Sequence, residues 1–350
     1  MGNAGVPVVV GLDNGGTSNN ATVLTVDGRF LVDGLVEIPS EVRAGPEAAI
    51  EALARALDGV LALTGVPREL VRAVGLDTPG PASADGVISS RGSTNFSQPE
   101  WRGYDVRGAL ERRLGLPVVY LNDGNAAALY AHHTYFGADA MRRSSVSAIV
   151  GTGLGGGVVE AGRVIAGAAG MAGELGHVHL PLLGVLTPDQ PEPTCACGFV
   201  GDAESVASLT AIERNLLPYW LARFPGHPLA AEPPARAAKL VRAYGEQGDA
   251  LAREIFRQQA AAIGRLFTLA ANFTDPHAYF VGGGVVEAAP EFRDWFLATV
   301  REHTVLREEQ AAVATFALVP ERDMAGARGV AIAALEALRA EPAPRPLVGG

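Results

Sequence analysis

The sequence predicts a two-lobed α/β protein. At 350 residues, the chain is long enough for about two domains with a substantial core. Two stretches, beginning at Val8 and Ser147, repeat one pattern of an apolar strand, a turn rich in glycine and threonine, and a second strand. A third observation is an apolar run at 117–121 that leads directly into a helix-forming run. We therefore expect two related lobes, each opening with a glycine-rich hairpin that faces a cleft between them.

The first lobe is expected to span residues 1–121, together with a C-terminal helix at 327–340. Apolar runs predict its strands at 8–12, 21–26, 31–37, 71–77 and 118–121. Residues 46–63 have apolar side chains at helical spacing, closed by Gly65, and Asp105 is placed to cap a short helix. These elements give the first lobe both strands and helices, as an α/β unit requires.

The second lobe is expected to span residues 122–326. It begins with a helix at 126–133, and its strands are predicted at 148–150, 158–161 and 277–281, with a glycine-rich turn at 151–157. Helices are expected to dominate residues 204–272. The proline-rich tail at 341–350 is expected to be flexible.

Composition and charge narrow the class of protein. The hydrophobic content is 48% and the charged content 19%, which is typical of a globular protein. The net charge is −10 without a basic cluster, which disfavours nucleic acid and anionic membranes as partners. The sequence contains no apolar run of about 18 residues and no signal-peptide pattern, so we expect a cytoplasmic protein.

The stretch Leu121-Asn122-Asp123-Gly124-Asn125 is the most informative one for chemistry. It places Asp123 where a strand passes into a helix, the position at which α/β proteins put their sites. Asp123 is a candidate general base that takes a proton from a hydroxyl group during phosphoryl transfer. The alternative is a capping role, because Asp is favoured at helix N-termini.

Two glycine-rich turns are candidate phosphate sites. In the first, Asp13-Asn14-Gly15-Gly16-Thr17, glycines let N–H groups face an anion, and Asp13 suggests Mg²⁺. The second, Gly151–Gly157, formally contains the G-x-G-x-x-G pattern, and Glu174 follows about 20 residues later. A nicotinamide oxidoreductase is disfavoured, however, because a strand and not a helix follows this turn. Lys239 is the sole lysine and reads as part of a solvated helix face, which excludes a Gly-Lys-Ser/Thr phosphate loop.

Five motifs in order resemble the ROK family of sugar kinases and sugar-responsive repressors. They are 13–17, 122–127, 151–157, 173–177 and 195–198, and the resemblance runs from about residue 8 to 340. This family belongs to the actin-like ATPase superfamily, so the resemblance implies two lobes with a ribonuclease H-like fold and an interlobe cleft. It also implies ATP and Mg²⁺ as cofactors, a sugar substrate and a homodimer.

The resemblance implies roles for individual residues. Asp123 matches the catalytic base. The nucleotide contacts match Asp13, Gly15, Gly16, Thr17, Thr152, Gly153, Gly155, Gly156, Gly282, Gly283 and Gly284. The sugar contacts match Gly80, Asn95, Asn122, Asp123, Glu174, His177 and Glu204. Carboxylates, amides and imidazole suit sugar hydroxyls, because hydroxyls both donate and accept: carboxylates accept hydrogen bonds, and amides and imidazole accept and donate them.

A metal site is a separate question. The family often holds a structural zinc ion by one His and three Cys, and His177, Cys195 and Cys197 match three of those positions. The fourth position holds Asp202, a carboxylate that zinc also accepts. Two alternatives follow: a His-Cys-Cys-Asp zinc site, or an empty site held by hydrogen bonds among the same side chains. Cys195 and Cys197 are too close in sequence for an unstrained disulfide.

The leading hypothesis for function is an ATP-dependent kinase that phosphorylates the primary 6-hydroxyl of a glucose-like hexose. An amino sugar or a seven-carbon cyclitol of secondary metabolism is an alternative acceptor, and polyphosphate is an alternative donor. A non-catalytic sugar-sensing regulator of the same family is a hypothesis from another class. It is disfavoured because the first phosphate motif begins at Asp13, which leaves no room before it for a helix-turn-helix domain.

Overall fold

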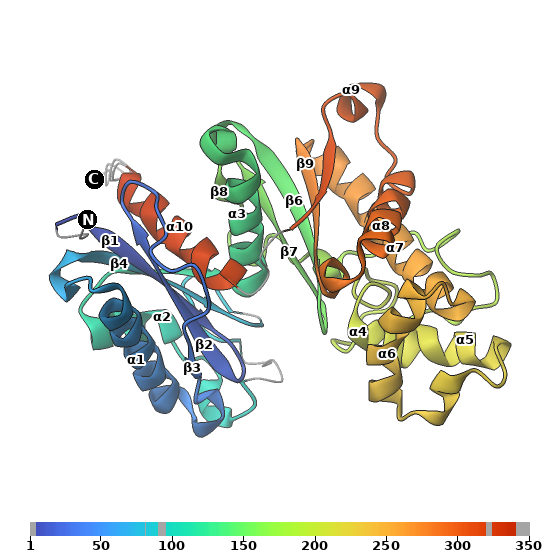
Figure 1. Cartoon of the computed structure of the whole chain (residues 1–350), viewed down its shortest axis with the longest axis horizontal. Coiled ribbons are helices and arrows are strands. Elements are labelled where there is room, and N and C mark those ends of the chain that lie inside the picture. The colour runs from blue at the N-terminus through green and yellow to red at the C-terminus, as the bar shows by residue number, and fades with distance from the viewer. Residues whose placement is uncertain (1–4, 81, 90–95, 320–323, 341–350) are drawn as a thin grey trace, which may run out of the picture. The chain divides into compact units, whose positions relative to one another are not determined.

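The computed structural model describes residues 5–80, 82–89, 96–319 and 324–340. The chain divides into two compact units. Unit 1 comprises Met1–Tyr130, Ala166–Met171 and Asp323–Gly350, and unit 2 comprises Ala131–Ile165 and Ala172–Arg322. Each unit contains one five-stranded sheet with helices, which confirms the α/β class (Figure 1). The division falls inside a helix, at Tyr130, and not at the predicted residue 121.

The sheet of unit 1 has the strand order β3-β2-β1-β4-β5. Its strands are β1 (Val8–Asn14), β2 (Ser18–Thr25), β3 (Glu37–Pro39), β4 (Val71–Thr78) and β5 (Val118–Asn122). Strands β1, β4 and β5 run parallel, whereas β2 pairs antiparallel with both β1 and β3. The three parallel strands therefore bring their carboxyl ends to one edge of the sheet.

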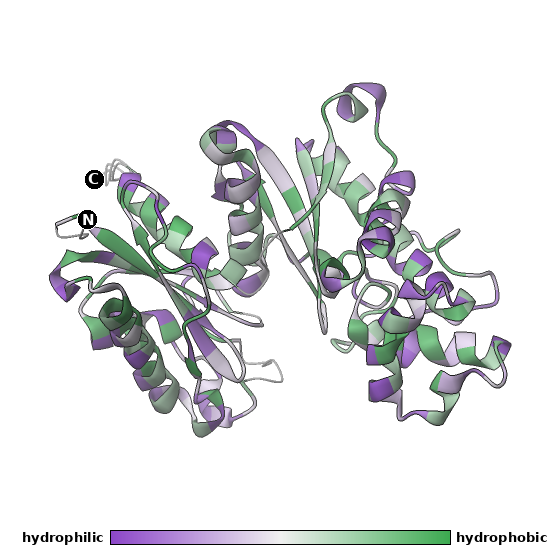
Figure 2. Cartoon of the chain, viewed as in Figure 1, coloured by the Kyte–Doolittle hydropathy of each residue, from purple (hydrophilic) through white to green (hydrophobic). Residues whose placement is uncertain are grey.

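Helices α1 (Pro46–Thr64) and α10 (Ala325–Arg339) cover opposite faces of this sheet. Alternate residues of β1 show this division: Val8, Val10 and Leu12 join the core with α1, whereas Gly11 meets α10. Figure 2 shows β1 largely in the hydrophobic colour and both colours on α1, as expected for a buried strand and an amphipathic helix. The predicted Gly65 cap of α1 is present in the left-handed conformation.

The sheet of unit 2 repeats this topology in the order β8-β7-β6-β9-β10. Its strands are β6 (Ser144–Val150), β7 (Leu154–Glu160), β8 (Arg163–Val164), β9 (Ala278–Gly283) and β10 (Thr315–Leu318). As in unit 1, the first three strands of this order pair antiparallel and the last three run parallel. The repeated strand–turn–strand pattern in the sequence thus corresponds to two sheets of the same topology.

Eight further α-helices belong to the described residues. They are α2 (Val106–Leu114), α3 (Asp123–Phe136), α4 (Leu209–Ala211), α5 (Leu217–Arg223), α6 (Pro234–Glu246), α7 (Ala250–Thr274), α8 (Pro290–Glu302) and α9 (Glu308–Ala311). Residues of α7 join Val146 and Val281 of the second sheet in the main core of unit 2. Among the described residues, no helix is both long and apolar enough to cross a membrane.

Three predicted elements need correction. The strand expected at 31–37 is wrong: β3 is Glu37–Pro39, because the chain bends around Asp33 and Gly34. The glycine turn expected at 151–157 is shorter, because β7 begins at Leu154; within β7, a Cβ at Gly156 would lie 2.2 Å from Ser147 O. Helix α3 begins at Asp123, three residues before the predicted start at 126. Residues 341–350 lie outside the described part of the chain.

Candidate functional site

The first glycine turn joins β1 to β2 in unit 1. Gly15 donates its N–H to Ser18 O at 2.9 Å, and a Cβ at Gly15 would lie 2.6 Å from that oxygen, so a side chain does not fit there. Thr17 is exposed, and Asp13 stands at the end of β1, where Asn20 Nδ2 donates to its Oδ2 at 3.3 Å. A close glycine turn, an exposed hydroxyl and a carboxylate therefore meet at this strand end.

Asp77 was not singled out by the sequence, yet it is fully buried and pairs in register with Asp13 on the neighbouring strand. Burial raises the pKa of Asp77 well above its ordinary value, and the negative charge of Asp13 raises it further. Burial also raises the pKa of Asp13. A proton or a cation between the two carboxylates relieves their repulsion. The sequence did contain a feature that could have identified Asp77: it is an acid at the end of an apolar strand, as Asp123 is.

Asp123 is the first residue of α3 and follows β5 directly. Asn122, not Asp123, makes the bond of a helix cap, because its Oδ1 accepts the N–H of Asn125 at 2.7 Å. Asp123 Oδ1 accepts the N–H of Gly124 at 2.8 Å. The carboxylate of Asp123 thus lies at the N-terminus of α3, directly after β5, while Asn122 makes the capping bond.

The register of the parallel strands lines up the candidates of unit 1. Asp13 pairs with Asp77, and the next residue of β4, Thr78, pairs with Asn122. Asp123 lies near enough to add its charge to those that raise the pKa of Asp77. Gly80 follows in the turn after β4 with φ 88°, a conformation that favours glycine. The predicted sugar contact Asn95 lies outside the described residues.

The second glycine turn joins β6 to β7 in unit 2. Gly151 donates to Gly153 O at 2.9 Å, which closes the turn within three residues. The turn is also held from the segment that begins α4. There, Leu209 N donates to Gly151 O at 3.0 Å, and Thr210 Oγ1 donates to Thr152 O at 2.8 Å. Gly155 and Gly156, predicted to lie in the turn, belong to β7 instead.

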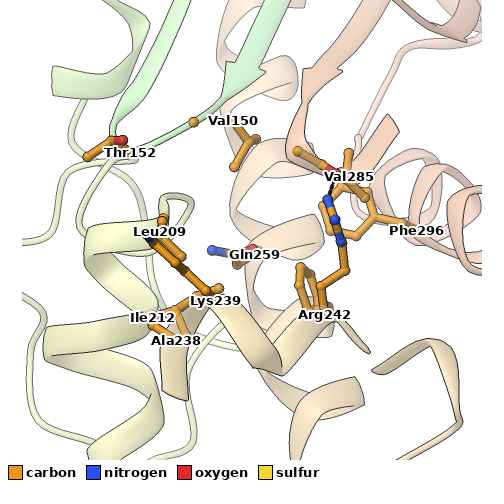
Figure 3. A pocket seen from close by; sticks show the side chains of 13 residues that line it. Val150, Thr152, Leu209, Ile212, Ala238, Lys239, Arg242, Gln259, Val285 and Phe296 are labelled. Atoms are coloured by element: carbon orange, nitrogen blue, oxygen red, sulfur yellow. Dashed lines mark hydrogen bonds between the residues drawn. The ribbon is translucent and has the colours of Figure 1, made fainter. Parts of the chain in front are cut away.

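A cavity of about 290 Å³ in unit 2 opens beside this turn (Figure 3). Gly151 and Thr152 form one side, and Gly284 and Val285 form another. Its apolar wall comes from Leu209, Ile212, Phe256 and Phe296. Apolar walls with a few polar groups are typical of ligand pockets, and this volume suits a small aromatic group. The pocket thus joins the second glycine turn to the turn after β9.

Glycine is required where β9 ends at this pocket. Gly283 has φ 91°, and a Cβ there would lie 1.9 Å from Val150 O. Gly282 is also tight, with a would-be Cβ 2.7 Å from Ile149 Cδ1. The close approach of β9 to β6 therefore explains the glycines that precede Gly284.

Two basic residues of α6, Lys239 and Arg242, also line the pocket, and the sequence did not place them in a site. Arg242 donates to Gly284 O at 2.6 Å and pairs with Glu287 at 3.0 Å, so it braces the turn after β9 (Figure 3). Lys239 is exposed, as predicted for a helix face, but that face borders the pocket. The only feature of the sequence that could have drawn attention to Lys239 as a pocket residue is that it is the sole lysine.

Glu174, His177 and Glu204, the predicted sugar contacts of unit 2, lie in two neighbouring segments. Glu204 donates its backbone N–H to Gly176 O at 2.8 Å, which joins its segment to the one that carries Glu174 and His177. Glu204 Oε2 accepts the N–H of Leu154 at 2.8 Å, and its Oε1 accepts from Cys195 Sγ at 3.2 Å. Both carboxylate oxygens of Glu204 therefore already accept hydrogen bonds from the protein.

His177, Cys195, Cys197 and Asp202 form a compact cluster in which one ligand atom of each lies within 4.8 Å of the others. His177 Nδ1 lies 3.2 Å from Asp202 Oδ2, and the two sulfur atoms lie 3.1 Å apart. Both cysteines are free, and burial raises the pKa of the Cys195 thiol. Four ligands of nitrogen, sulfur and oxygen type match the donor set and number that zinc prefers.

The match to known proteins covers almost the whole chain. The model of the ROK family matches residues 9–337. The chain belongs to the ROK family. The glucokinase of Streptomyces coelicolor is 32% identical over 79% of this chain and 82% of its own. The N-acetylmannosamine kinase of Escherichia coli O7:K1 is 29% identical over 93% of this chain and 97% of its own.

Solved structures of the ROK family agree with the fold. The ROK hexokinase of Thermus thermophilus matches with a TM-score of 0.73 at 31% identity, over 95% of this chain and 99% of that one. The ROK glucokinase of Streptomyces griseus, solved with glucose and AMPPNP, matches with a TM-score of 0.68 at 27% identity, over 94% and 99%. The actin-like ATPase architecture expected from the sequence is thereby confirmed.

For this ROK-family chain, the predicted site residues fall into two groups. Unit 1 brings together the ends of β1, β4 and β5, with Asp13, Asn122 and Asp123. Unit 2 brings together the second glycine turn, the pocket and the segments of His177 and Glu204. Each group contains polar groups of the kind that phosphate or a sugar requires.

Proposed function

We propose that this ROK-family sugar kinase transfers the γ-phosphate of ATP to the primary hydroxyl of a hexose or a hexose-like sugar, with Asp123 as general base. The observation that carries the proposal is the position of Asp123. It follows β5, beside strand ends that carry Asp13 and Thr78, with the helix cap supplied by Asn122. A carboxylate in this position can accept the proton of the attacking hydroxyl as the bond to phosphorus forms.

The nucleotide is assigned to the pocket of unit 2. The adenine ring would occupy the apolar wall beside Gly284 and Val285, and the phosphates would meet the N–H groups of the turn at Gly151 and Thr152. The first turn at Gly15 and Thr17, in unit 1, is a second candidate phosphate site. The cations of Lys239 and Arg242 would offset part of the nucleotide's negative charge.

Asp13 and Asp77 fit a divalent cation, because two adjacent carboxylates, one of them fully buried, repel each other unless a positive charge lies between them. Mg²⁺ bound there would neutralise charge on the phosphates of ATP. The protein itself supplies the base and the orientation of the phosphates. Asp123 would accept the proton of the acceptor hydroxyl, and the glycine turns would orient the phosphates.

The acceptor is proposed to be glucose-like, with Asn122, Glu174, His177 and Glu204 as its hydroxyl partners. The glucokinase relatives support this choice, since several are 31–32% identical to the chain. An amino sugar is the second candidate, because the N-acetylmannosamine kinase relative matches over almost the full length of both chains. A seven-carbon cyclitol is a further candidate acceptor, and polyphosphate is an alternative phosphate donor, because the same base and phosphate sites would serve both.

A structural zinc ion is proposed for the cluster of His177, Cys195, Cys197 and Asp202. The support is geometric, since four ligand atoms of suitable type already lie within 4.8 Å of one another. The carboxylate of Asp202 is fully buried and accepts the N–H of Ser205 at 2.8 Å, so it is fixed in place. Zinc would cross-link the segments at 177, 195–197 and 202.

The proposal is tested by measuring ADP release from ATP across glucose, mannose, N-acetylated amino sugars and cyclitols, with polyphosphate as a second donor. We expect ADP release that depends on a hexose, with the product phosphorylated on the primary hydroxyl. Sugar binding without ADP release would favour the sensing regulator. Release with an amino sugar or a cyclitol alone would reassign the acceptor but keep the kinase.

A further inference from the structure

Glu204 connects three parts of unit 2 that the proposed function treats separately. Its Oε2 accepts the N–H of Leu154, at the end of the second glycine turn, at 2.8 Å. Its Oε1 accepts from Cys195 Sγ, a member of the His-Cys-Cys-Asp cluster, at 3.2 Å. Its backbone N–H donates to Gly176 O at 2.8 Å, beside His177. One side chain thus spans the turn and the cluster.

The second glycine turn is shaped around this carboxylate. A Cβ at Gly153 would lie 2.4 Å from Glu204 Oε2, closer than real Cβ contacts, and 3.2 Å from its Cδ. Gly176 is similarly constrained, since a Cβ there would lie 2.3 Å from Leu154 O. Glycine at both positions therefore allows Glu204 and the segment of His177 to pack directly on the turn.

The other side of the turn is held by backbone partners. Leu209 and Thr210 donate to the carbonyl groups of Gly151 and Thr152, which line the proposed nucleotide pocket. On the Leu154 side, the carboxylate of Glu204 is the partner of the N–H group. A hydrogen bond to a charged acceptor is about twice as strong as one between neutral groups. Loss of this bond would leave the Leu154 end of the turn held by the pairing of Leu154 with Val150 of β6, without the charged partner of its N–H.

We propose that Glu204 is a positioning residue for the nucleotide: its carboxylate, by accepting the Leu154 N–H, fixes the second glycine turn in the shape that binds phosphate. The role is separate from the sugar contact expected of Glu204, because it acts on the turn before any sugar is bound. It rests on the proposed function only in taking the pocket beside the turn as the nucleotide site.

The first test needs no ligand. Hydrogen exchange of a peptide that contains residues 151–157 is compared between the wild-type protein and Glu204→Ala. We expect at least tenfold faster exchange at the Leu154 amide in the variant. Glu204→Gln should stay near wild type, because its amide oxygen still accepts the Leu154 N–H. Unchanged exchange in Glu204→Ala would overturn the proposal, whatever the pocket binds.

The second test uses a double-mutant cycle on ADP affinity, measured by calorimetry without sugar. We expect Gly153→Ala to weaken ADP binding about tenfold or more, because the new Cβ collides with the carboxylate. Glu204→Ala should weaken it several-fold. The double variant should be no weaker than Glu204→Ala alone, because removing the carboxylate makes room for the Cβ. Additive losses would contradict the proposed packing.

Glu160→Ala is the matched control, since Glu160 is exposed at the other end of β7. It should leave both the exchange and the ADP affinity unchanged. If wild-type protein does not bind ADP, the nucleotide assignment fails, while the exchange experiment still decides the role of Glu204. A rise in the KM for ATP without a matching fall in kcat in Glu204→Ala would further support positioning.

Discussion

At the scale of single residues, Asp123 and Asp77 show how the same side chain takes different roles in one sheet. Asp123 lies at the N-terminus of α3, and its neighbour Asn122 performs the capping. Asp77 lies within the sheet and is fully buried beside Asp13, which disfavours its charge. The surroundings, and not the residue type, therefore distinguish Asp123, the candidate base, from Asp77, whose carboxyl group has a raised pKa.

Asp123→Asn is expected to lower kcat by about 10²–10⁴-fold, because the amide cannot accept the proton of the acceptor hydroxyl. The fold should be kept, since an Asn oxygen can still accept the N–H of Gly124, as Asp123 Oδ1 does at 2.8 Å. Steady-state kinetics and sugar binding by calorimetry check this prediction. Sugar affinity should largely survive. Near-normal turnover would refute the role of Asp123 as base.

Asp77→Asn is expected to stabilise the protein at pH 8. An acid whose pKa is raised on folding destabilises the folded state above its unfolded pKa, and this cost grows until the pH passes the raised pKa. Each unit of such a shift corresponds to about 1.4 kcal/mol. Urea unfolding without Mg²⁺ should show a larger gain in the free energy of unfolding at pH 8 than at pH 5. An equal effect at both pH values would argue against a raised pKa.

At the scale of elements, unit 1 depends on the close contact between helix α10 and the strands β1 and β4. Glycines make this contact possible: a Cβ at Gly11 would lie 1.9 Å from Ala327 O, and one at Gly75 would lie 2.0 Å from Val330 O. The sequence predicted the helix and the strands, but it could not show that these glycines face the helix. Only the register of β1 and β4 against α10 reveals their purpose.

Gly75→Ala is expected to lower the free energy of unfolding by about 1–3 kcal/mol, because the added methyl group must push α10 away from β4. Gly59→Ala is the matched control, since Gly59 is exposed on α1 with open space around it. It should be neutral or stabilising by about 0.4–1 kcal/mol. Chemical denaturation of both variants checks the prediction, and similar effects would rule out a packing role for Gly75.

At the scale of the whole molecule, the two sheets share one topology but differ in what they carry. The sheet of unit 1 carries the carboxylates Asp13, Asp77 and Asp123 at its strand ends. Unit 2 carries the apolar pocket and the cluster of His177, Cys195, Cys197 and Asp202. A metal ion in the cluster should therefore stabilise unit 2 alone, by linking segments within it.

Protein purified without added zinc is expected to contain about one zinc ion per chain, and chelation should destabilise unit 2. At a free zinc concentration of 100 times Kd, the stabilisation is about 2.7 kcal/mol. Elemental analysis and hydrogen exchange before and after chelation check this. Cys197→Ser should mimic chelation, since Cys197 is exposed and contributes little packing. A zinc content near zero would remove the metal site.

The sequence by itself determined the α/β class, the repeated strand–turn–strand pattern and the position of Asp123, because apolar periodicity and turn residues act locally. It mislocated β3, because the chain bends at Asp33 and Gly34, and it made the second glycine turn too long, because β7 already begins at Leu154. Only the tertiary structure showed that Asp77 is buried beside Asp13, that Lys239 borders a pocket, and that Glu204 reaches both Leu154 and Cys195. These are contacts between residues distant in the chain, and they are fixed by strand register and packing, which no local pattern records.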